Sequence, residues 1–305
     1  MIRSEYPEGK VYLFLDEIQE WKNWDYNIRW LHDVKDFFLY ISGSSSTLQS
    51  SEIPTKLRGR YISKIIFPIS FKELINFEVE DFRHIGKIYN LLEEYIRWGG
   101  FPELILYKDI EKLNSLLETV FYRDIIERNK IRNIDVFRII SRFILSNYSN
   151  TFTYNSLKNY LRSFNINIDV KTIIKYIEAM RKYFLLFTLE RFSYSEKKKL
   201  ISPKKIYLID TSFTSIFNQG EDIGRKMENI VFIELLRREN YLPEENILIE
   251  VTYSIDKEHE KKVLSAMYEL KCKNSIIITW DYEDNKTINN LNIKFIPLWK
   301  WLLNL

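Results

Sequence analysis

The sequence predicts an α/β protein made of three successive parts: a parallel sheet, a helical region and a small α/β unit. Three observations predict this order. Near the N-terminus, continuous apolar runs alternate with helical patterns. In the middle, three helical patterns precede two strand-like runs, and after residue 215 strand-like runs flank helices again. The few glycines and prolines, 8 and 7, favour short loops and many helices.

The composition is that of a globular chain. Of 305 residues, 46% are hydrophobic and 29% are charged, which favours two or three domains. The net charge of +3 does not by itself indicate nucleic-acid binding. A single cysteine, Cys272, excludes an internal disulfide, and no apolar run approaches ~20 residues. We therefore expect a cytoplasmic protein with no membrane partner.

The first part, residues 1–80, contains three strand patterns. They are VYLFL, DFFLYISG and YISKIIFPIS, which begin at Val11, Asp36 and Tyr61. Ile18, Trp21, Trp24 and Ile28 follow the first strand at helical spacing, and FKELINF follows the third. Strands that are apolar on both faces and separated by helices predict a parallel sheet covered on both sides.

The middle of the chain is predicted to be helical. Residues 81–132 show helical patterns interrupted by the loop WGGFPE. Within 133–215, one helix runs from Asp135 to Ser146, a second is capped by Thr153 and a third by Asp169. FLLFTLERF and IYLID then predict a hairpin, and three helices followed by a hairpin are the order of a winged helix-turn-helix.

The last part, 216–305, is predicted to be a small α/β unit. It opens with the helix GRKMENIVFIELLRREN. ILIEVTYSID and NSIIITWDYED are predicted strands around a helix from Glu258 to Cys272, and KFIPLWKWLLNL is predicted to be a strand and then a helix.

Paired acids follow the first strand directly. Asp16, at the end of the strand, could hold a Mg²⁺ ion that bridges phosphate oxygens, and Glu17 could orient an attacking water. The alternative is a solvated helix start, where the helix dipole favours acids in any protein.

The next two strands carry residues that suit the same chemistry. Ser42 and Ser44 surround a glycine at the end of the second strand, where a hydroxyl could sense a γ-phosphate. Arg58 and Arg60 precede the third strand, and a guanidinium there could stabilise charge on a transferred phosphate. Each feature alone is common, whereas their order and spacing together are more specific.

The ordered motifs VYLFLDEIQEW, ISGSSSTLQSSE, LRGRYI, FPISFKEL, WGGFPE, FYRDIIERN, SPKKIYLIDTSF and GRKMENIVFIELLRR resemble a known family. It is the archaeal and bacterial AAA+-type ATPases with a winged helix and a C-terminal restriction-endonuclease-like domain. The resemblance implies an incomplete P-loop NTPase core in 1–80, a lid-like region in 81–132, a winged helix in 133–215 and an endonuclease-like domain in 216–305.

The resemblance also implies roles for individual residues. Asp16 and Glu17 would be the Walker B pair, with Asp16 holding Mg²⁺ through ATP. Ser42 or Ser44 would be sensor-like, and Arg60 would be an arginine finger or sensor. Because an arginine finger acts across subunits, a homo-oligomer is an option.

The sequence departs from the family at the phosphate loop. It contains no G-x-x-x-x-G-K-[ST] motif, and the lysine and backbone N–H groups of such a loop bind the phosphates. We therefore expect neither ATP nor Mg²⁺ to bind tightly to this chain alone. The strand that leads into the loop normally separates the sensor strand from the strand at SKIIFPI. We hypothesise a truncated, split or decayed member that an upstream fragment could complete.

A second departure lies in the endonuclease-like part. In a PD-(D/E)xK site, Glu228 would be the helix acid and Glu250 the strand acid, but Thr252 stands where a lysine is needed. We therefore expect a nuclease-like scaffold without cleavage activity.

Lysines gather in the predicted winged helix. Two lie on its third helix and five near its hairpin turn: Lys171, Lys175, Lys197, Lys198, Lys199, Lys204 and Lys205. They suit contacts with DNA phosphates, while a solvated face or a protein contact is the alternative.

Three functional hypotheses follow. One is an ATPase whose ATP hydrolysis is coupled to DNA or partner binding, although it is not competent alone. The second is a non-catalytic winged-helix remnant that binds DNA or protein. The third is a fragment of a decaying gene without function.

Overall fold

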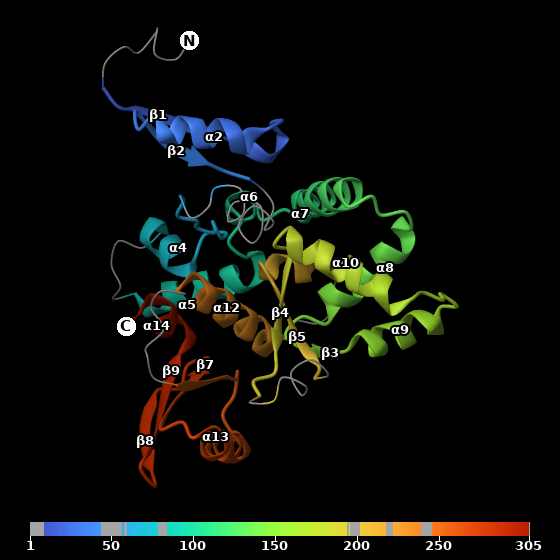
Figure 1. The fold of residues 1–305 in the computed structure, drawn as a ribbon. Coiled ribbons are helices and arrows are strands. Elements are labelled where there is room, and N and C mark those ends of the chain that lie inside the picture. The colour runs from blue at the N-terminus through green and yellow to red at the C-terminus, as the bar shows by residue number, and fades with distance from the viewer. Residues whose placement is uncertain are drawn as a thin grey trace. The chain divides into compact units, whose positions relative to one another are not determined.

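The computed structural model describes residues 9–43, 57, 60–78, 84–193, 195, 202–217, 222–238 and 246–304 (Figure 1). These residues form two compact units. The first comprises residues up to 65 together with 178–185, and the second comprises 66–177 and the residues from 186 onward.

The first unit contains a short parallel sheet. Its elements are β1 (Val11–Leu15), the 3-10 helix η1 (Ile18–Glu20), α2 (Trp24–Asp33) and β2 (Phe37–Ile41). β1 and β2 pair in parallel, with Leu13 opposite Leu39. Ile18, Trp24 and Ile28 are buried against one face of the two strands. The prediction of a parallel sheet in this region is confirmed in this short form, whereas the expected cover on both faces is wrong for these strands, because Tyr12 and Phe14 are exposed.

The predicted helix after the first strand is interrupted. Asn23 adopts a left-handed backbone with φ of 59°, so the α-helix begins only at Trp24. The side chain of Trp21 is 49% exposed and lies outside the core that contains Trp24. The expectation of one continuous helical face from Ile18 to Ile28 is therefore wrong.

The predicted third strand is also wrong. Residues 60–70 form no strand. Ile62 and Ile66, which the pattern placed in a buried strand, are 94% and 89% exposed. A strand is stable only when its N–H and C=O groups are paired, and no strand of the described residues pairs with this segment.

The second unit begins with a helical region. Its elements are α4 (Phe71–Glu78), α5 (Ile85–Trp98), α6 (Pro102–Tyr107), α7 (Ile110–Leu117) and the π-helical η3 (Glu118–Glu127). Pro102 starts α6 at a position where its missing N–H has no cost. Asp109 caps α7 by accepting from the N–H of Glu111.

Helices and a small antiparallel sheet follow. The elements are α8 (Ile134–Ser146), β3 (Thr151–Phe152), α9 (Tyr154–Ser163), α10 (Val170–Lys182), β4 (Leu186–Glu190) and β5 (Lys204–Leu208). The end of α10, from residue 178, is grouped with the first unit. The strand order is β3-β5-β4, and both pairs are antiparallel. The prediction that Thr153 caps the second helix is confirmed, because Thr153 and Ser156 form a reciprocal capping box.

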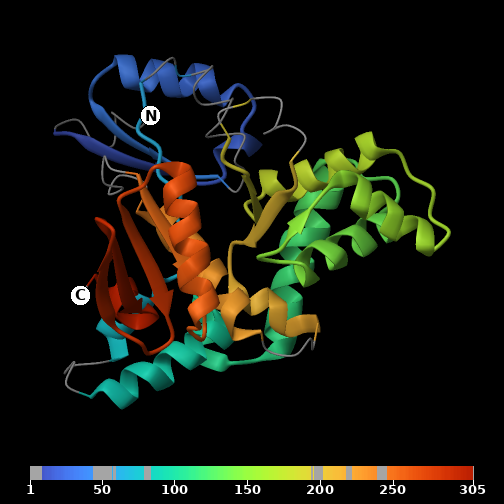
Figure 2. The same cartoon turned by 90° about the horizontal axis from the view of Figure 1, so that it is seen from below.

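The chain ends in a mixed sheet. The elements are the 3-10 helix η4 (Thr211–Phe217), α12 (Ile223–Arg237), β6 (Ile247–Val251), α13 (Lys257–Leu270), β7 (Asn274–Thr279), β8 (Asp284–Ile288), β9 (Leu291–Pro297) and α14 (Leu298–Leu303). The strand order is β6-β7-β9-β8, in which only the β8–β9 pair is antiparallel. Figure 2 shows α13 along this sheet, where Val263 and Met267 pack against Ile277 and Phe295.

The main core of the second unit lies between α4, α5, α12 and α14. Phe71, Leu92, Met227 and Leu298 are buried in it. α14 follows β9 directly and is buried over most of its surface, so the end of the mixed sheet is anchored in this core. None of the helices in the described parts of the chain combines the length and the apolar composition that a membrane span requires.

Candidate functional site

The ends of β1 and β2 bring Asp16 and Ser42 together. The N–H of Ser42 donates to Leu15 O at 3.0 Å, and the N–H of Ile18 donates to Ser42 O at 3.1 Å. These bonds extend the parallel pairing past the strands, and the Ser42 hydroxyl donates to Asp16 Oδ1. Both side chains are exposed, so the carboxylate lies open at the carboxyl edge of the sheet.

Glu17 has an unusual backbone conformation. Its φ of 46° and ψ of 47° are left-handed, which costs a residue with a Cβ about 1–2 kcal/mol. Its side chain is half-buried. The turn thus separates the two adjacent acids, so that Asp16 stays exposed while Glu17 leaves the strand direction.

The structure does not show the other residues predicted for the nucleotide site, Ser44, Arg58 and Arg60, together with Asp16 and Ser42. Ser44 and Arg58 lie outside the described residues. Arg60 is exposed, and its N–H donates to Leu57 O at 3.2 Å. Among the contacts of the described residues, the Arg60 guanidinium has no ion pair.

The Asp16 end fits one half of a Mg²⁺–nucleotide site. One carboxylate and a neighbouring hydroxyl suit a magnesium ion that takes its other oxygens from water and phosphate. The described residues contain no cluster of three His, Cys, Asp or Glu side chains that could hold a metal by itself. The phosphate side is not matched, because the sequence has no glycine-rich phosphate loop.

The predicted DNA-binding lysines fall into three groups. Lys171 and Lys175 are exposed on α10. Lys197, Lys198 and Lys199 lie outside the described residues. Lys204 pairs with Glu190, and Lys205 pairs with Glu228. These last two ammonium groups therefore already have carboxylate partners within the protein.

Glu228 and Glu250 lie near each other, and Glu228 forms an ion pair with Lys205. Glu228 Oε1 accepts from the Tyr207 hydroxyl at 2.6 Å and from the Lys205 ammonium. Partial desolvation, followed by the charge of Glu228, raises the pKa of Glu250. Thr252, where a nuclease would need lysine, donates to Ser254 O at 2.6 Å.

A buried polar cluster, formed by Gly99, Gly100, Asp210, Glu234 and Arg237, occupies the second unit. The Gly100 N–H donates to Asp210 Oδ2 at 2.7 Å. Gly99 has a φ of 72° and a ψ of −157°, and a Cβ there would lie 1.6 Å from Asp210 Oδ1. Burial raises the pKa of Asp210, against the effect of the hydrogen bonds from Ser212 and Gly100. Sequence reasoning missed this cluster, although its motifs are prominent.

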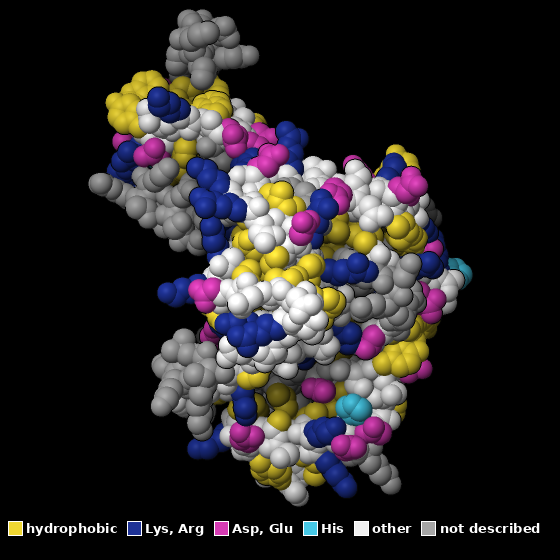
Figure 3. Space-filling view, turned by 90° about the vertical axis from the view of Figure 1, so that its right-hand side faces the viewer, with side chains coloured by type: hydrophobic (Ala, Val, Ile, Leu, Met, Phe, Trp, Pro, Cys, Tyr) yellow, Lys and Arg dark blue, Asp and Glu magenta, His cyan; other side chains and the backbone are white. Residues whose placement is uncertain are grey.

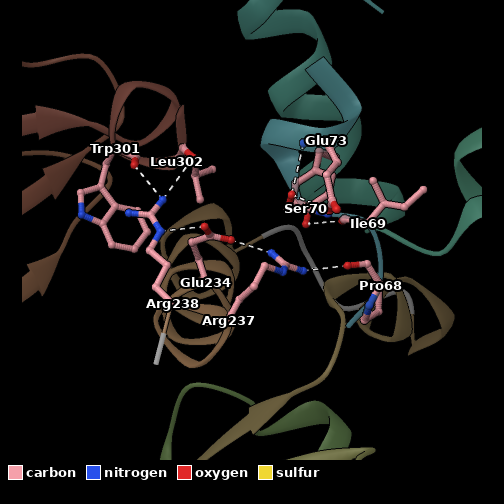
Figure 4. Close-up of polar contacts among 10 residues, drawn as sticks. Pro68, Ile69, Ser70, Glu73, Glu234, Arg237, Arg238, Trp301 and Leu302 are labelled. Carbon is pink, nitrogen blue, oxygen red and sulfur yellow. Dashed lines mark hydrogen bonds and ion pairs between the residues drawn. The ribbon is translucent and has the colours of Figure 1, made fainter. Parts of the chain in front are cut away.

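Glu234 joins two arginines within the same unit. Its carboxylate accepts from Arg237 at 2.6 Å and from Arg238 at 2.7 Å (Figure 4). Arg237 also donates to Pro68 O at 2.7 Å, and Arg238 donates to the carbonyls of Trp301 and Leu302 at 3.0 and 3.1 Å. α12 thereby fixes both the segment that leads into α4 and the end of α14.

The segment at Pro68 is held at several points. The N–H of Ile69 donates to Gly100 O at 2.8 Å, and the Tyr95 hydroxyl donates to Ile69 O at 2.9 Å. The next residue, Ser70, donates to Glu73 through its N–H and hydroxyl, and these bonds lower the pKa of Glu73. The start of α4 is therefore rigidly attached to the second unit.

Comparison with known proteins supports an AAA assignment at the N-terminus. Residues 1–75 match the AAA domain family, and residues 89–220 match a domain of unknown function, DUF8612. The uncharacterized protein MJ1544 of Methanocaldococcus jannaschii is 35% identical, over 95% of this chain and 74% of that protein.

Two further relatives are also uncharacterized. A protein of Haemophilus influenzae is 28% identical, over 78% of this chain and 61% of its own length. MJ1637 of Methanocaldococcus jannaschii is 27% identical, over 97% of this chain and 71% of its own length. Given the identity and coverage of the first relative, this chain belongs to the same family as MJ1544, with an AAA domain at its N-terminus.

Proposed function

We propose that this chain supplies the acid and sensor half of a Mg²⁺–ATP site in an AAA-type ATPase. Asp16 holds the magnesium ion, Glu17 orients the attacking water and Ser42 senses the γ-phosphate. The observation that carries the proposal is the hydrogen bond between Ser42 and Asp16 at the carboxyl edge of two paired parallel strands. Ligands of open α/β sheets bind outside this edge.

Each residue of the proposed site has a separate role. The Ser42 hydroxyl orients the Asp16 carboxylate, and the left-handed turn keeps Glu17 apart from it. A bound magnesium ion would neutralise charge on the phosphate oxygens. The phosphate cradle itself must come from another segment, because this sequence has no phosphate loop. ATP hydrolysis therefore needs a partner segment, whether from an upstream fragment or another chain.

A fusion protein tests this proposal. A strand, a G-x-x-x-x-G-K-[ST] loop and a helix from an active AAA ATPase would be joined ahead of residue 9. We expect Mg²⁺-dependent ATP hydrolysis that falls at least about 100-fold in Glu17→Gln, because the water loses its base. Asp16→Asn should lower the rate and raise the Mg²⁺ concentration that hydrolysis requires, because the ion loses a charged ligand. Glu20→Gln, at a neighbouring exposed acid, should leave hydrolysis unchanged.

Two results would count against the assignment. The first is hydrolysis that is indifferent to both Asp16→Asn and Glu17→Gln. The second is a fusion that binds ATP with wild-type stability and never hydrolyses it. Nucleotide binding and hydrolysis would be measured on the same preparations, so that a failure to bind is separated from a failure of chemistry.

DNA binding by a winged helix is a second candidate function. Its support is the order α8, α9, α10 followed by the β4–β5 hairpin, with β3 pairing β5. Lys171 and Lys175 are exposed on α10, the third helix of this order. Such cations suit contacts with DNA phosphates rather than sequence readout. A protein partner at the same face is the alternative.

The lysines of α10 provide the test. Lys171→Ala with Lys175→Ala should weaken duplex DNA binding uniformly across sequences. The slope of log K against log salt should fall by about 2, since each phosphate contact contributes about 0.9. Lys261→Ala with Lys273→Ala, two exposed lysines of the mixed-sheet region, is the matched control. Equal slopes for all three proteins would remove α10 from a DNA interface.

For the mixed-sheet region we propose a nuclease-like scaffold without cleavage activity. The Lys205 ammonium already neutralises Glu228, and Thr252 cannot act as the lysine that assists a nucleophilic water. The region instead supports the core of the second unit through α12 and α14.

A further inference from the structure

One face of the β1–β2 pair carries four open aromatic rings. Tyr12 lies opposite Phe38, and Phe14 lies opposite Tyr40. Both ring pairs are stacked, with centroids 4.9 Å apart and interplanar angles of 16° and 14°. The four residues, here called the aromatic face, are 57%, 41%, 75% and 53% exposed in the order named.

This exposure is unusual for parallel strands. Parallel sheets are normally covered on both faces, and α2 covers only the opposite one, through Trp24 and Ile28. With each ring about half exposed, roughly 400 Å² of aromatic surface lies open. Figure 3 shows hydrophobic side chains gathered on the surface of this unit. A patch of this size matches the largest apolar patch on a typical monomer, and such patches are often functional.

Opposite charges stand at the two ends of the aromatic face. At the start of β1, the Lys10 ammonium lies 5.0 Å from the centroid of the Phe38 ring. At the other end, Asp16, directly after β1, follows Tyr12 and Phe14 at every second position, so it belongs to the same face. Ser42, directly after β2, follows Phe38 and Tyr40 in the same way, and its hydroxyl donates a hydrogen bond to Asp16. Along β1 the face is therefore a cation, two rings and a carboxylate.

We propose that a second copy of this chain docks on the aromatic face. A twofold axis that lies parallel to the face and perpendicular to the strands would place the two faces against each other, with β1 antiparallel to the partner's β1. Lys10 would then lie beside the partner's Asp16, and Asp16 beside the partner's Lys10, because about 20 Å of strand separates the two ends in each copy. The four rings of each copy would stack on those of the other, between these two charge pairs.

The charge pattern selects this occupant. A pattern with a cation at one end and an acid at the other is complementary to its own twofold image, as an isologous interface requires. The open surface is about half of the ~800 Å² that each partner buries in a standard interface, so the dimer is weak and concentration-dependent. The contact needs no nucleotide, and it covers the Asp16 end on which the proposed nucleotide site depends.

Sedimentation equilibrium of the full chain, without nucleotide, tests the dimer. We expect a monomer–dimer equilibrium between about 1 μM and about 1 mM protein. Phe14→Ser should weaken dimerisation at least tenfold, because this ring is the most exposed of the four. Tyr26→Ser removes a ring that is 66% exposed on α2, away from the aromatic face, and should leave the equilibrium unchanged.

A charge exchange tests the orientation. Lys10→Glu and Asp16→Lys should each weaken the dimer several-fold, because like charges then meet across the axis. The double variant reverses both ends and should restore the association. Far-UV circular dichroism would check that each exposed substitution leaves the fold intact.

Three outcomes would overturn the proposal: a monomer at every concentration, association unaffected by Phe14→Ser, or a double variant no better than the single ones. The first would leave the face to an apolar segment of a different polypeptide, the second would place the dimer contact elsewhere on the chain, and the third would refute the antiparallel arrangement. Because ATP is absent throughout, none of these outcomes bears on the roles of Asp16 and Glu17 in hydrolysis.

Discussion

Gly99→Ala is expected to destabilise the second unit by at least about 3 kcal/mol, enough to prevent stable folding at physiological temperature. The backbone at Gly99, with φ of 72° and ψ of −157°, is open almost only to glycine. A methyl group would also lie 1.6 Å from Asp210 Oδ1 and 2.4 Å from its carboxyl carbon. Because Asp210 is buried and holds the Gly100 N–H, it cannot move aside without losing that bond.

The same substitution thirteen residues earlier is the control. Gly86 lies in α5, the helix that Gly99 terminates, and nothing lies within 4 Å of a Cβ placed there. Gly86→Ala should raise stability by up to about 1 kcal/mol, because alanine favours a helix. Urea unfolding followed by circular dichroism compares the two variants. Equal effects would contradict the fit between Gly99 and Asp210.

Glu234→Ala is expected to cost about 3 kcal/mol, because it leaves two largely buried arginines without their shared carboxylate. The Glu234 side chain is 8% exposed, while Arg237 and Arg238 are 22% and 19% exposed. The guanidinium groups would keep carbonyl partners at Pro68 and at the end of α14, and the rings of Phe67 and Trp301, but they would lose their shared carboxylate. Amide hydrogen exchange should rise at the start of α4 and in α14 together.

An exposed ion pair of the same unit is the matched control. Glu94 pairs with Lys108 at 2.7 Å, with side chains 48% and 43% exposed. Glu94→Ala should change the free energy of unfolding by no more than about 0.5 kcal/mol, because solvent screens such pairs. If Glu94→Ala cost as much as Glu234→Ala, the two arginines would not depend on Glu234.

Local sequence patterns predicted the elements that depend on local physics. The N-cap at Thr153 and the order β6, α13, β7 arise from neighbouring residues, and both are confirmed. β8 was missed because its sequence, DNKTI, is mostly polar. The sequence did contain a turn signal, the pair Asn289–Asn290, because asparagine tolerates the left-handed backbone of a tight hairpin turn. These two residues have φ of 50° and 63° and form the turn of the β8–β9 hairpin.

The features that sequence patterns did not predict depend on contacts between residues far apart in the chain. The third strand failed because its apolar pattern says nothing about whether a neighbouring strand exists to pair with it. Gly100 and Asp210, 110 residues apart, meet in the buried polar cluster, and no local pattern indicates that contact. The ion pair between Lys205 and Glu228 likewise joins residues far apart in the sequence, and no local pattern predicted it. Asp16 and Ser42 could be paired in advance because parallel strands end at one edge of a sheet.

ATP binding by the chain alone tests the central claim, that Asp16, Glu17 and Ser42 form half of a site without a phosphate cradle. Isothermal titration of residues 1–305 with ATP and Mg²⁺ should show no saturable binding stronger than a dissociation constant of ~1 mM, about 4 kcal/mol. Micromolar affinity that Asp16→Asn abolishes would contradict the account, because the chain would then hold the phosphates without a phosphate loop.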